Sequence, residues 1–221
     1  MESYFVEKSL PFYDQLYHKI KKMILDGVFK PGERIVESKL AKEMNLSRTP
    51  IREAIRVLEN EGLVVIDEKS RIIVYNPTVK DVEDVYQCRM ALESLAVKLS
   101  VQRASDQEMA EIEKVLELCN NKIEQREYDK DEVIDLNFQF HNLIIHYSAN
   151  DLLQKHLNSI KSRLHLYRIL NFQGDDRAQI IYNEHKKIFD YMKEKNETKA
   201  AEAMVEHLNH DYKHLIGLLA T

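Results

Sequence analysis

Residues 46–59 predict an amphipathic helix with a basic, hydroxyl-rich N-terminal end. Ser47 or Thr49 can cap the helix, and Pro50 suits its first turn. Apolar residues recur at helical spacing, namely Ile51, Ala54, Ile55 and Leu58. Such an end suits a DNA duplex, because guanidinium groups fork onto guanine edges and hydroxyls reach phosphates. The alternative is an ordinary amphipathic helix whose arginines are solvated.

The neighbouring segments favour DNA binding. Residues 37–44 predict a short helix, and Asn45 can take the left-handed turn that ends it. Two helices joined by so short a turn make a helix-turn-helix. The β-branched runs 63–66 and 71–75 predict a two-stranded wing, and an apolar pattern within residues 11–27 predicts a further helix.

Eight side chains of this region are candidate DNA contacts. They are Arg34, Lys39, Ser47, Arg48, Thr49, Arg52, Lys69 and Arg71. The net charge of the chain is −5, but residues 1–76 carry 13 basic and 12 acidic side chains, and the remainder carries 19 and 25. The excess acid therefore lies away from the predicted DNA contact, and phosphate contacts there should weaken as salt rises.

The same region resembles the winged-helix domain of the GntR family of bacterial transcription regulators. The matching motifs are Pro31-Gly32-Glu33-Arg34-Ile35, Leu40-Ala41, Ser47-Arg48-Thr49-Pro50-Ile51-Arg52-Glu53-Ala54 and Leu58-Glu59-x-Glu61-Gly62-Leu63. The resemblance implies a homodimer that brings two reading helices to two half-sites of double-stranded operator DNA. At the wing tip, where the family often has an Arg-Gly pair, this chain has Ser70-Arg71.

The remainder of the chain is predicted to be helical, so the protein is mainly α. Asn76-Pro77-Thr78 predicts the boundary between a winged helix-turn-helix domain, residues 1–76, and a helical domain, residues 77–221. Breaks in the pattern delimit six helices in an antiparallel bundle, at 79–103, 106–126, 130–148, 151–171, 176–194 and 198–219.

Composition excludes several classes of protein. No apolar run approaches membrane-spanning length, and the first residues lack the order of a secretory signal, so we expect a cytoplasmic protein with no membrane contact. Cys88 and Cys119 lack the C-x-x-C spacing, which argues against a disulfide framework or a thiolate zinc site.

Histidines on three predicted bundle helices fall on apolar faces. His141, His185 and His207 each point inward, and Asn137 lies one turn before His141 on the same face. Three imidazoles and an oxygen donor suit a transition metal such as zinc or nickel. The alternatives are hydrogen-bonded core histidines, or His210 or His214 in place of His207.

The helical part resembles the FCD effector domain of the FadR subfamily of GntR regulators. The matching motifs are Arg89-x-x-Leu92-Glu93-x-x-Ala96-x-x-Leu99, Phe140-His141, Asn150-x-x-Leu153, Glu184-His185-x-x-Ile188 and His207-Leu208. Many such domains hold a metal with three histidines and an aspartate one turn before the first. In this chain those positions are Asn137, His141, His185 and His207, so an amide replaces the carboxylate.

These features lead to a functional hypothesis. The chain is predicted to be a DNA-binding transcription regulator, not an enzyme, controlled by a small carboxylate effector bound at the metal. Arg89 is the candidate second anchor for that acid; the alternative is an intrahelical ion pair between Arg89 and Glu93. A metal-responsive regulator is the runner-up. A metal-dependent hydrolase fits less well, because the inward faces offer no general base.

Overall fold

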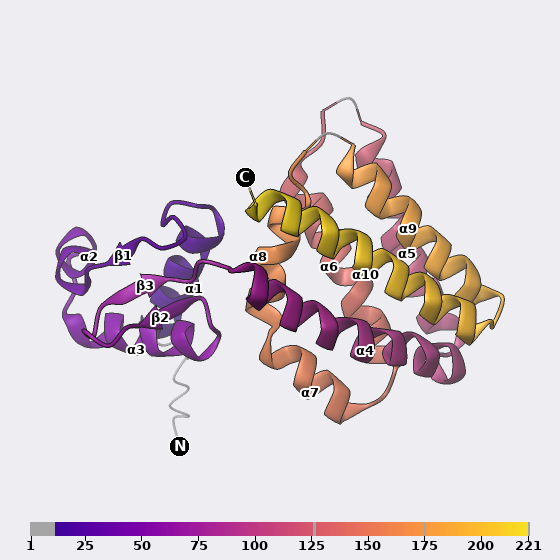
Figure 1. Ribbon diagram of the computed structural model, residues 1–221, viewed down its shortest axis with the longest axis horizontal. Helices are drawn as coiled ribbons and strands as arrows, with labels where there is room; N and C mark the ends of the chain where they lie inside the picture. The colour runs from indigo at the N-terminus through magenta and orange to yellow at the C-terminus, as the bar shows by residue number, and fades with distance from the viewer. Residues whose placement is uncertain (1–11, 126, 175, 221) are drawn as a thin grey trace, which may run out of the picture. The chain divides into compact units, whose positions relative to one another are not determined.

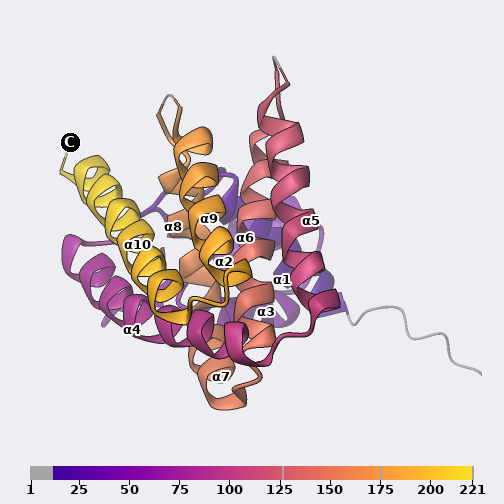
Figure 2. The same cartoon turned by 90° about the vertical axis from the view of Figure 1, so that its right-hand side faces the viewer.

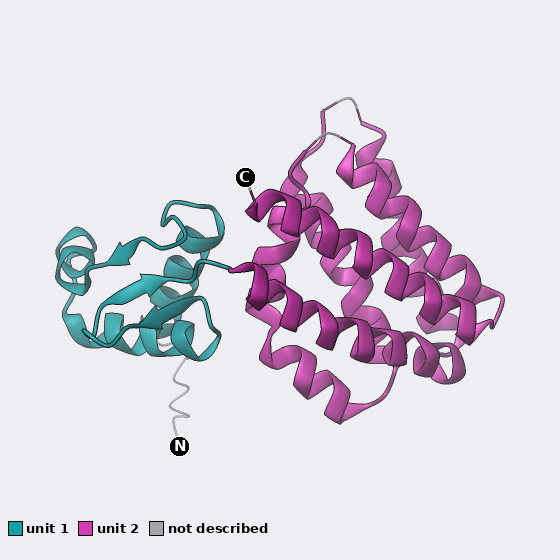
Figure 3. Ribbon diagram, viewed as in Figure 1, with its two compact units in different colours: residues 1–77 teal, residues 78–221 magenta. Residues whose placement is uncertain are grey.

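The computed structural model describes residues 12–125, 127–174 and 176–220, which form two compact units. The first spans residues 1–77 and the second residues 78–221 (Figure 3). Within the described residues, no helix combines the length and the apolar character that crossing a membrane would require.

The first unit is a winged helix-turn-helix (Figure 1). Its elements are α1 (Phe12–Leu25), β1 (Arg34–Ile35), α2 (Glu37–Glu43), α3 (Arg48–Asn60), β2 (Val64–Ile66) and β3 (Ile72–Val74). The core joins apolar residues of the three helices and the sheet, among them Ile20, Leu40, Ile51 and Leu58. Asn45 has φ 54°, so the predicted left-handed turn between α2 and α3 is confirmed.

The sheet contains a strand that the sequence does not predict. Its antiparallel order is β1-β3-β2, and Arg34 of β1 pairs with Ile73 of β3. β1 is only two residues long, too short to show an alternating pattern. This pairing places Arg34 beside the wing.

The second unit is a helical bundle (Figures 1 and 2). Its helices are α4 (Val79–Arg103), α5 (Asp106–Ile123), α6 (Lys130–Tyr147), α7 (Asp151–Ser159), α8 (Lys161–Asn171), α9 (Arg177–Lys193) and α10 (Glu197–Leu219). Thr78 and Ser105 begin α4 and α5 with capping boxes. α6 contacts α4, α5, α8 and α9, and α10 packs along α4 and α9.

The prediction of one helix over 151–171 was wrong, so the bundle has seven described helices rather than six. Ile160 leaves helical geometry with φ −112° and ψ 7°, which separates α7 from α8. The Ile160 amide donates to the carbonyl of Leu157, and the Ser159 hydroxyl donates to that of His156. These bonds close α7 with a tight final turn, without the glycine or proline that would mark a break in the sequence.

Candidate metal centre and DNA-binding face

The winged unit exposes all eight candidate DNA contacts. Four of them, Arg34, Arg48, Arg52 and Arg71, line one surface hollow of about 430 Å³, together with Ser38 and Ser70. The hollow thus joins β1, the start of α3 and the wing. Lys39, Ser47, Thr49 and Lys69 are exposed outside its lining.

Local geometry leaves the start of α3 open to a partner. Ser47 is the N-cap residue, yet its side chain accepts no capping hydrogen bond. Arg52 Nε lies 3.1 Å from Glu37, and Arg71 Nη2 lies 2.6 Å from Asp67. Hydrogen bonds from Arg71 hold the pKa of Asp67 below its usual value. Exposed ion pairs like these contribute little to stability, so a phosphate can replace either carboxylate at small cost.

The three predicted histidines meet inside the bundle. His141 of α6, His185 of α9 and His207 of α10 are each at most 2% exposed, and their candidate ligand atoms all lie within 4.8 Å of one another. The Nε2 atoms of His185 and His207 are 3.2 Å apart. Two imidazole nitrogens on one zinc, each about 2.0–2.1 Å from it, lie about 2.9–3.4 Å apart, so the spacing fits a metal.

Two carboxylates hold the outer nitrogens of this cluster. His141 Nδ1 donates to Glu93 Oε2 at 2.6 Å, and His207 Nδ1 donates to Glu184 Oε2 at 2.7 Å. Each bond fixes the tautomer that leaves the Nε2 lone pair for a metal, an arrangement typical of metal-binding histidines. Neither carboxylate's role as a histidine partner was predicted, because each contact joins two helices and has no signature in sequence spacing.

Burial favours the neutral form of two imidazoles of the cluster, those of His141 and His185. Burial lowers the pKa of His141 to about 3, although Glu93 opposes the shift. Burial also lowers the pKa of His185 well below its usual value. Burial alone would raise the pKa of Glu93, but Arg89 and His141 hold it well below its usual value. At neutral pH, His141 and His185 therefore have the uncharged form that binds a metal.

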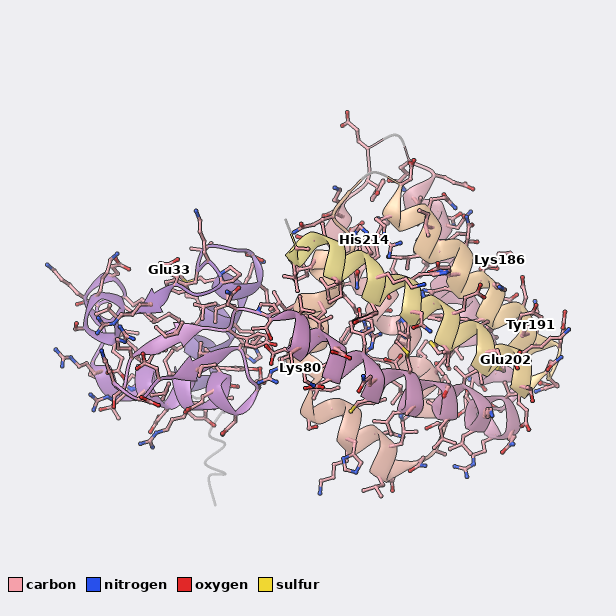
Figure 4. The ribbon with its side chains drawn as sticks, in the orientation of Figure 1. Glu33, Lys80, Lys186, Tyr191, Glu202 and His214 are labelled. Carbon is pink, nitrogen blue, oxygen red and sulfur yellow. The ribbon has the colours of Figure 1, made fainter. Side chains whose placement is uncertain are left out.

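The alternative histidines lie elsewhere. His210 is exposed and donates to the second oxygen of Glu184. His214, labelled in Figure 4, lies toward the C-terminal end of α10, and its Nε2 lies 3.0 Å from the carbonyl oxygen of Gln173. Neither belongs to the group formed by His141, His185 and His207.

Asn137 and Asp211 each lie one helical turn from a histidine of the cluster, Asn137 from His141 on α6 and Asp211 from His207 on α10. Asn137 is 3% exposed, and its Oδ1 has no hydrogen-bond partner within the described part of the chain. An orphaned buried oxygen is costly, which fits an atom that completes a metal site. Asp211 was missed by the sequence analysis, although it follows His207 by one helical turn. Its Oδ2 lies 3.7 Å from His207 Nε2, and its Oδ1 accepts from Arg177 at 2.8 Å.

Arg89 is fully buried beside this centre. Its Nε donates to Glu93 Oε1 at 2.7 Å, so the ion pair that the sequence allowed is present, although it is internal rather than on the surface. Its Nη1 and Nη2 have no partner among the described residues. A single carboxylate therefore connects Arg89 to His141 of the histidine cluster.

Comparison with known proteins identifies both units. Residues 12–74 match the model of bacterial regulatory proteins of the gntR family, and residues 84–210 match the FCD domain. The uncharacterized HTH-type transcriptional regulator YdhC of Bacillus subtilis (strain 168) is 42% identical over 99% of this chain and 97% of its own length. The chain belongs to the GntR family.

Other relatives of this GntR-family protein are also regulators. The Nta operon transcriptional regulator of Aminobacter aminovorans is 29% identical over 86% of this chain and 88% of its own. The structure of E. coli McbR/YncC matches with a TM-score of 0.75 at 21% identity, over 95% of this chain and 99% of that one, which shows the same fold. The protein is a DNA-binding transcription regulator with an FCD effector-binding domain, and it is not an enzyme.

Proposed function

We propose that this protein is a cytoplasmic, homodimeric repressor of the FadR subfamily. Its affinity for operator DNA would be modulated by a small organic acid bound at a metal in the FCD domain. The observation that carries the proposal is the convergence of His141, His185 and His207, with their ligand atoms within 4.8 Å.

The metal would be held by the three histidines, with Asn137 Oδ1 as the oxygen donor. Zinc or nickel suits this donor set, because imidazole nitrogens bind borderline transition metals well. When bound, the ion supplies a positive charge and an open position for a carboxylate oxygen of the effector. Glu93 and Glu184 keep the imidazoles of His141 and His207 in the required orientation.

Arg89 is proposed as the second anchor of the acid. A guanidinium has five N–H donors, and the bond to Glu93 uses only the one on Nε. The two Nη atoms are left to form paired, charge-assisted hydrogen bonds with a carboxylate. The ion pair with Glu93 thus orients the Arg89 guanidinium and leaves its Nη1 and Nη2 donors available to a ligand.

The DNA-binding domain, residues 1–76, is proposed to insert the start of α3 into the major groove. Arg48 and Arg52 would read bases, while Ser47, Thr49, Arg34 and Lys39 would contact phosphates; Lys69 and Arg71 would lie along the neighbouring groove. Two copies of the chain would present two such helices to a near-palindromic operator.

A second candidate is a regulator for which the metal itself is the signal. The observation that favours it is the burial of all three imidazoles, to at most 2% exposure, behind carboxylate partners. In that case, removing the metal changes DNA binding and organic acids have no further effect.

The two candidates separate in one DNA-binding titration. Operator fragments are first selected from genomic DNA with the purified protein, and affinity is then followed by fluorescence anisotropy. Organic acids added to the zinc-loaded protein should lower operator affinity, whereas no response to any acid but a response to chelator would favour the metal-responsive candidate. The variant Arg48→Ala/Arg52→Ala should lose operator preference, and Lys22→Ala, an exposed basic residue of α1, serves as the control.

A further inference from the structure

The FCD bundle contains more buried positive charge than its own carboxylates balance. The buried guanidiniums are those of Arg89, Arg168 and Arg177, and the buried carboxylates among the described residues are Glu93 and Asp211. Arg177 pairs with Asp211, and Arg89 pairs with Glu93. The charge of Arg168 therefore has no buried counterion of its own.

Arg89 and Arg168 are connected through Tyr86 of α4. The Arg89 guanidinium lies over the Tyr86 ring, and the Tyr86 hydroxyl accepts a hydrogen bond from Asn171, which follows Arg168 by three residues on α8. Arg168 lies on α8 and is 2% exposed, and its Nε has no hydrogen-bond partner within the described residues. Its guanidinium carbon lies 4.8 Å from the centre of the Phe138 ring of α6, and that of Arg89 lies 4.8 Å from the Tyr86 ring of α4. Aromatic faces attract these cations but accept none of their in-plane N–H groups.

Electrostatic repulsion also links the two guanidiniums to each other. Burial, and then the positive charge of Arg89, lower the pKa of Arg168 to about 10. Arg168 remains charged at neutral pH, so the bundle interior carries two cations with unpaired donors before any metal is added.

Asn171 of α8 also has an unpaired polar atom. Its Nδ2 donates to the Tyr86 hydroxyl at 2.7 Å, while its Oδ1 has no partner among the described residues. Buried polar groups are normally satisfied, and a buried charge without a partner is especially costly. Arg89, Arg168 and Asn171 thus present unpaired polar atoms from two helices.

We propose that the effector is a dianionic small acid, with one carboxylate at the metal and a second carboxylate between Arg89 and Arg168. This inference rests on the proposed function and narrows its ligand class. A monocarboxylate would satisfy the metal but leave the guanidinium pair unbalanced. Arg89 is connected to His141 through the single carboxylate of Glu93, so we expect both acid groups to belong to one small molecule, a dicarboxylate or hydroxydicarboxylate.

The experiment compares acids of matched length on the zinc-loaded, full-length protein. The probes are succinate, malate and glutarate against butyrate, 2-hydroxybutyrate and valerate, with affinity measured by isothermal titration calorimetry. At least one multiply charged acid should bind about tenfold or more tightly than every monocarboxylate, as expected for an added charge-assisted pair.

The variant Arg168→Met tests the residue directly. It should bring the preferred acid down to the affinity of the monocarboxylates, while leaving monocarboxylate binding and zinc content unchanged. Arg163→Met makes the same chemical change on α8 at a half-buried position and should keep the preference. The wild-type comparison stands alone if Arg168→Met does not fold.

Two different failures remain distinguishable. The proposal of a dianionic effector is overturned if monocarboxylates bind as tightly as the multiply charged acids, or if the preference for the multiply charged acids survives Arg168→Met. Either result would still be compatible with a regulator that responds to an organic acid. If no acid of either class binds the zinc-loaded protein, the proposed function falls together with the dianion.

Discussion

Replacing Glu93 by glutamine tests the link between the effector anchor and the metal centre. The side chain is 1% exposed, and it accepts from Arg89 Nε at 2.7 Å and from His141 Nδ1 at 2.6 Å. Glu93→Gln keeps the shape but removes the charge, so Arg89 becomes a buried cation without a counterion. Breaking a buried pair in this way costs about 3–5 kcal/mol of unfolding free energy.

The same change should weaken metal binding by about 10–100-fold, because His141 loses the carboxylate that orients it and increases its basicity. Urea denaturation of the metal-free protein measures the first effect, and competition with a chromophoric chelator measures the second. Asp84→Asn, an exposed carboxylate of the same helix, is the control and should change neither.

A second substitution separates the two effects. Adding Arg89→Met to Glu93→Gln removes the unpaired cation, so much of the lost stability should return while metal affinity stays low. If Glu93→Gln unfolds at the wild-type urea concentration, or if the double variant binds metal as tightly as wild type, Glu93 does not link Arg89 to the metal centre.

Three further predictions concern pH, the winged core and the oxygen donor. The pKa values of His141 and His185 in the folded protein lie below the unfolded value of 6.5, so the unfolded chain binds more protons at these residues. The metal-free protein should therefore lose stability as the pH falls below 6.5, by about 1.4 kcal/mol per histidine per pH unit. Urea denaturation at several pH values measures this loss. Leu58→Ala, at a fully buried site of α3, should cost about 2–5 kcal/mol and weaken DNA binding while chelator competition shows unchanged metal affinity. Asn137→Asp should raise metal affinity in the same competition assay, because a carboxylate adds charge to the donor set; equal affinity would remove Asn137 from that set.

Helical periodicity was sufficient to predict much of this molecule. It predicted that the apolar face of α3 packs inward. It also predicted that His141, His185 and His207 all point into the bundle interior, because a helix repeats its faces every three to four residues. Long, regular elements carry this signal strongly.

What periodicity did not predict depends on contacts between elements. The strand β1 exists because Arg34 and Ile35 find partners on β3, and the break at Ile160 has no glycine or proline to mark it. Glu93 and Glu184 accept hydrogen bonds from histidines 48 and 23 residues away. Sequence spacing could have found Asp211, one turn after His207, but not the guanidinium of Arg177 that holds it.

X-ray absorption at the metal edge gives the most direct test of the central claim, that the bundle holds a transition metal through three imidazoles. The purified protein should contain about one zinc or nickel ion per chain, with imidazole scattering that is fitted by three histidine ligands. The variant His185→Ala should lose the metal, or its spectrum should be fitted by two histidine ligands. A protein without stoichiometric metal after loading, or a bound metal whose spectrum lacks imidazole scattering, would contradict the account.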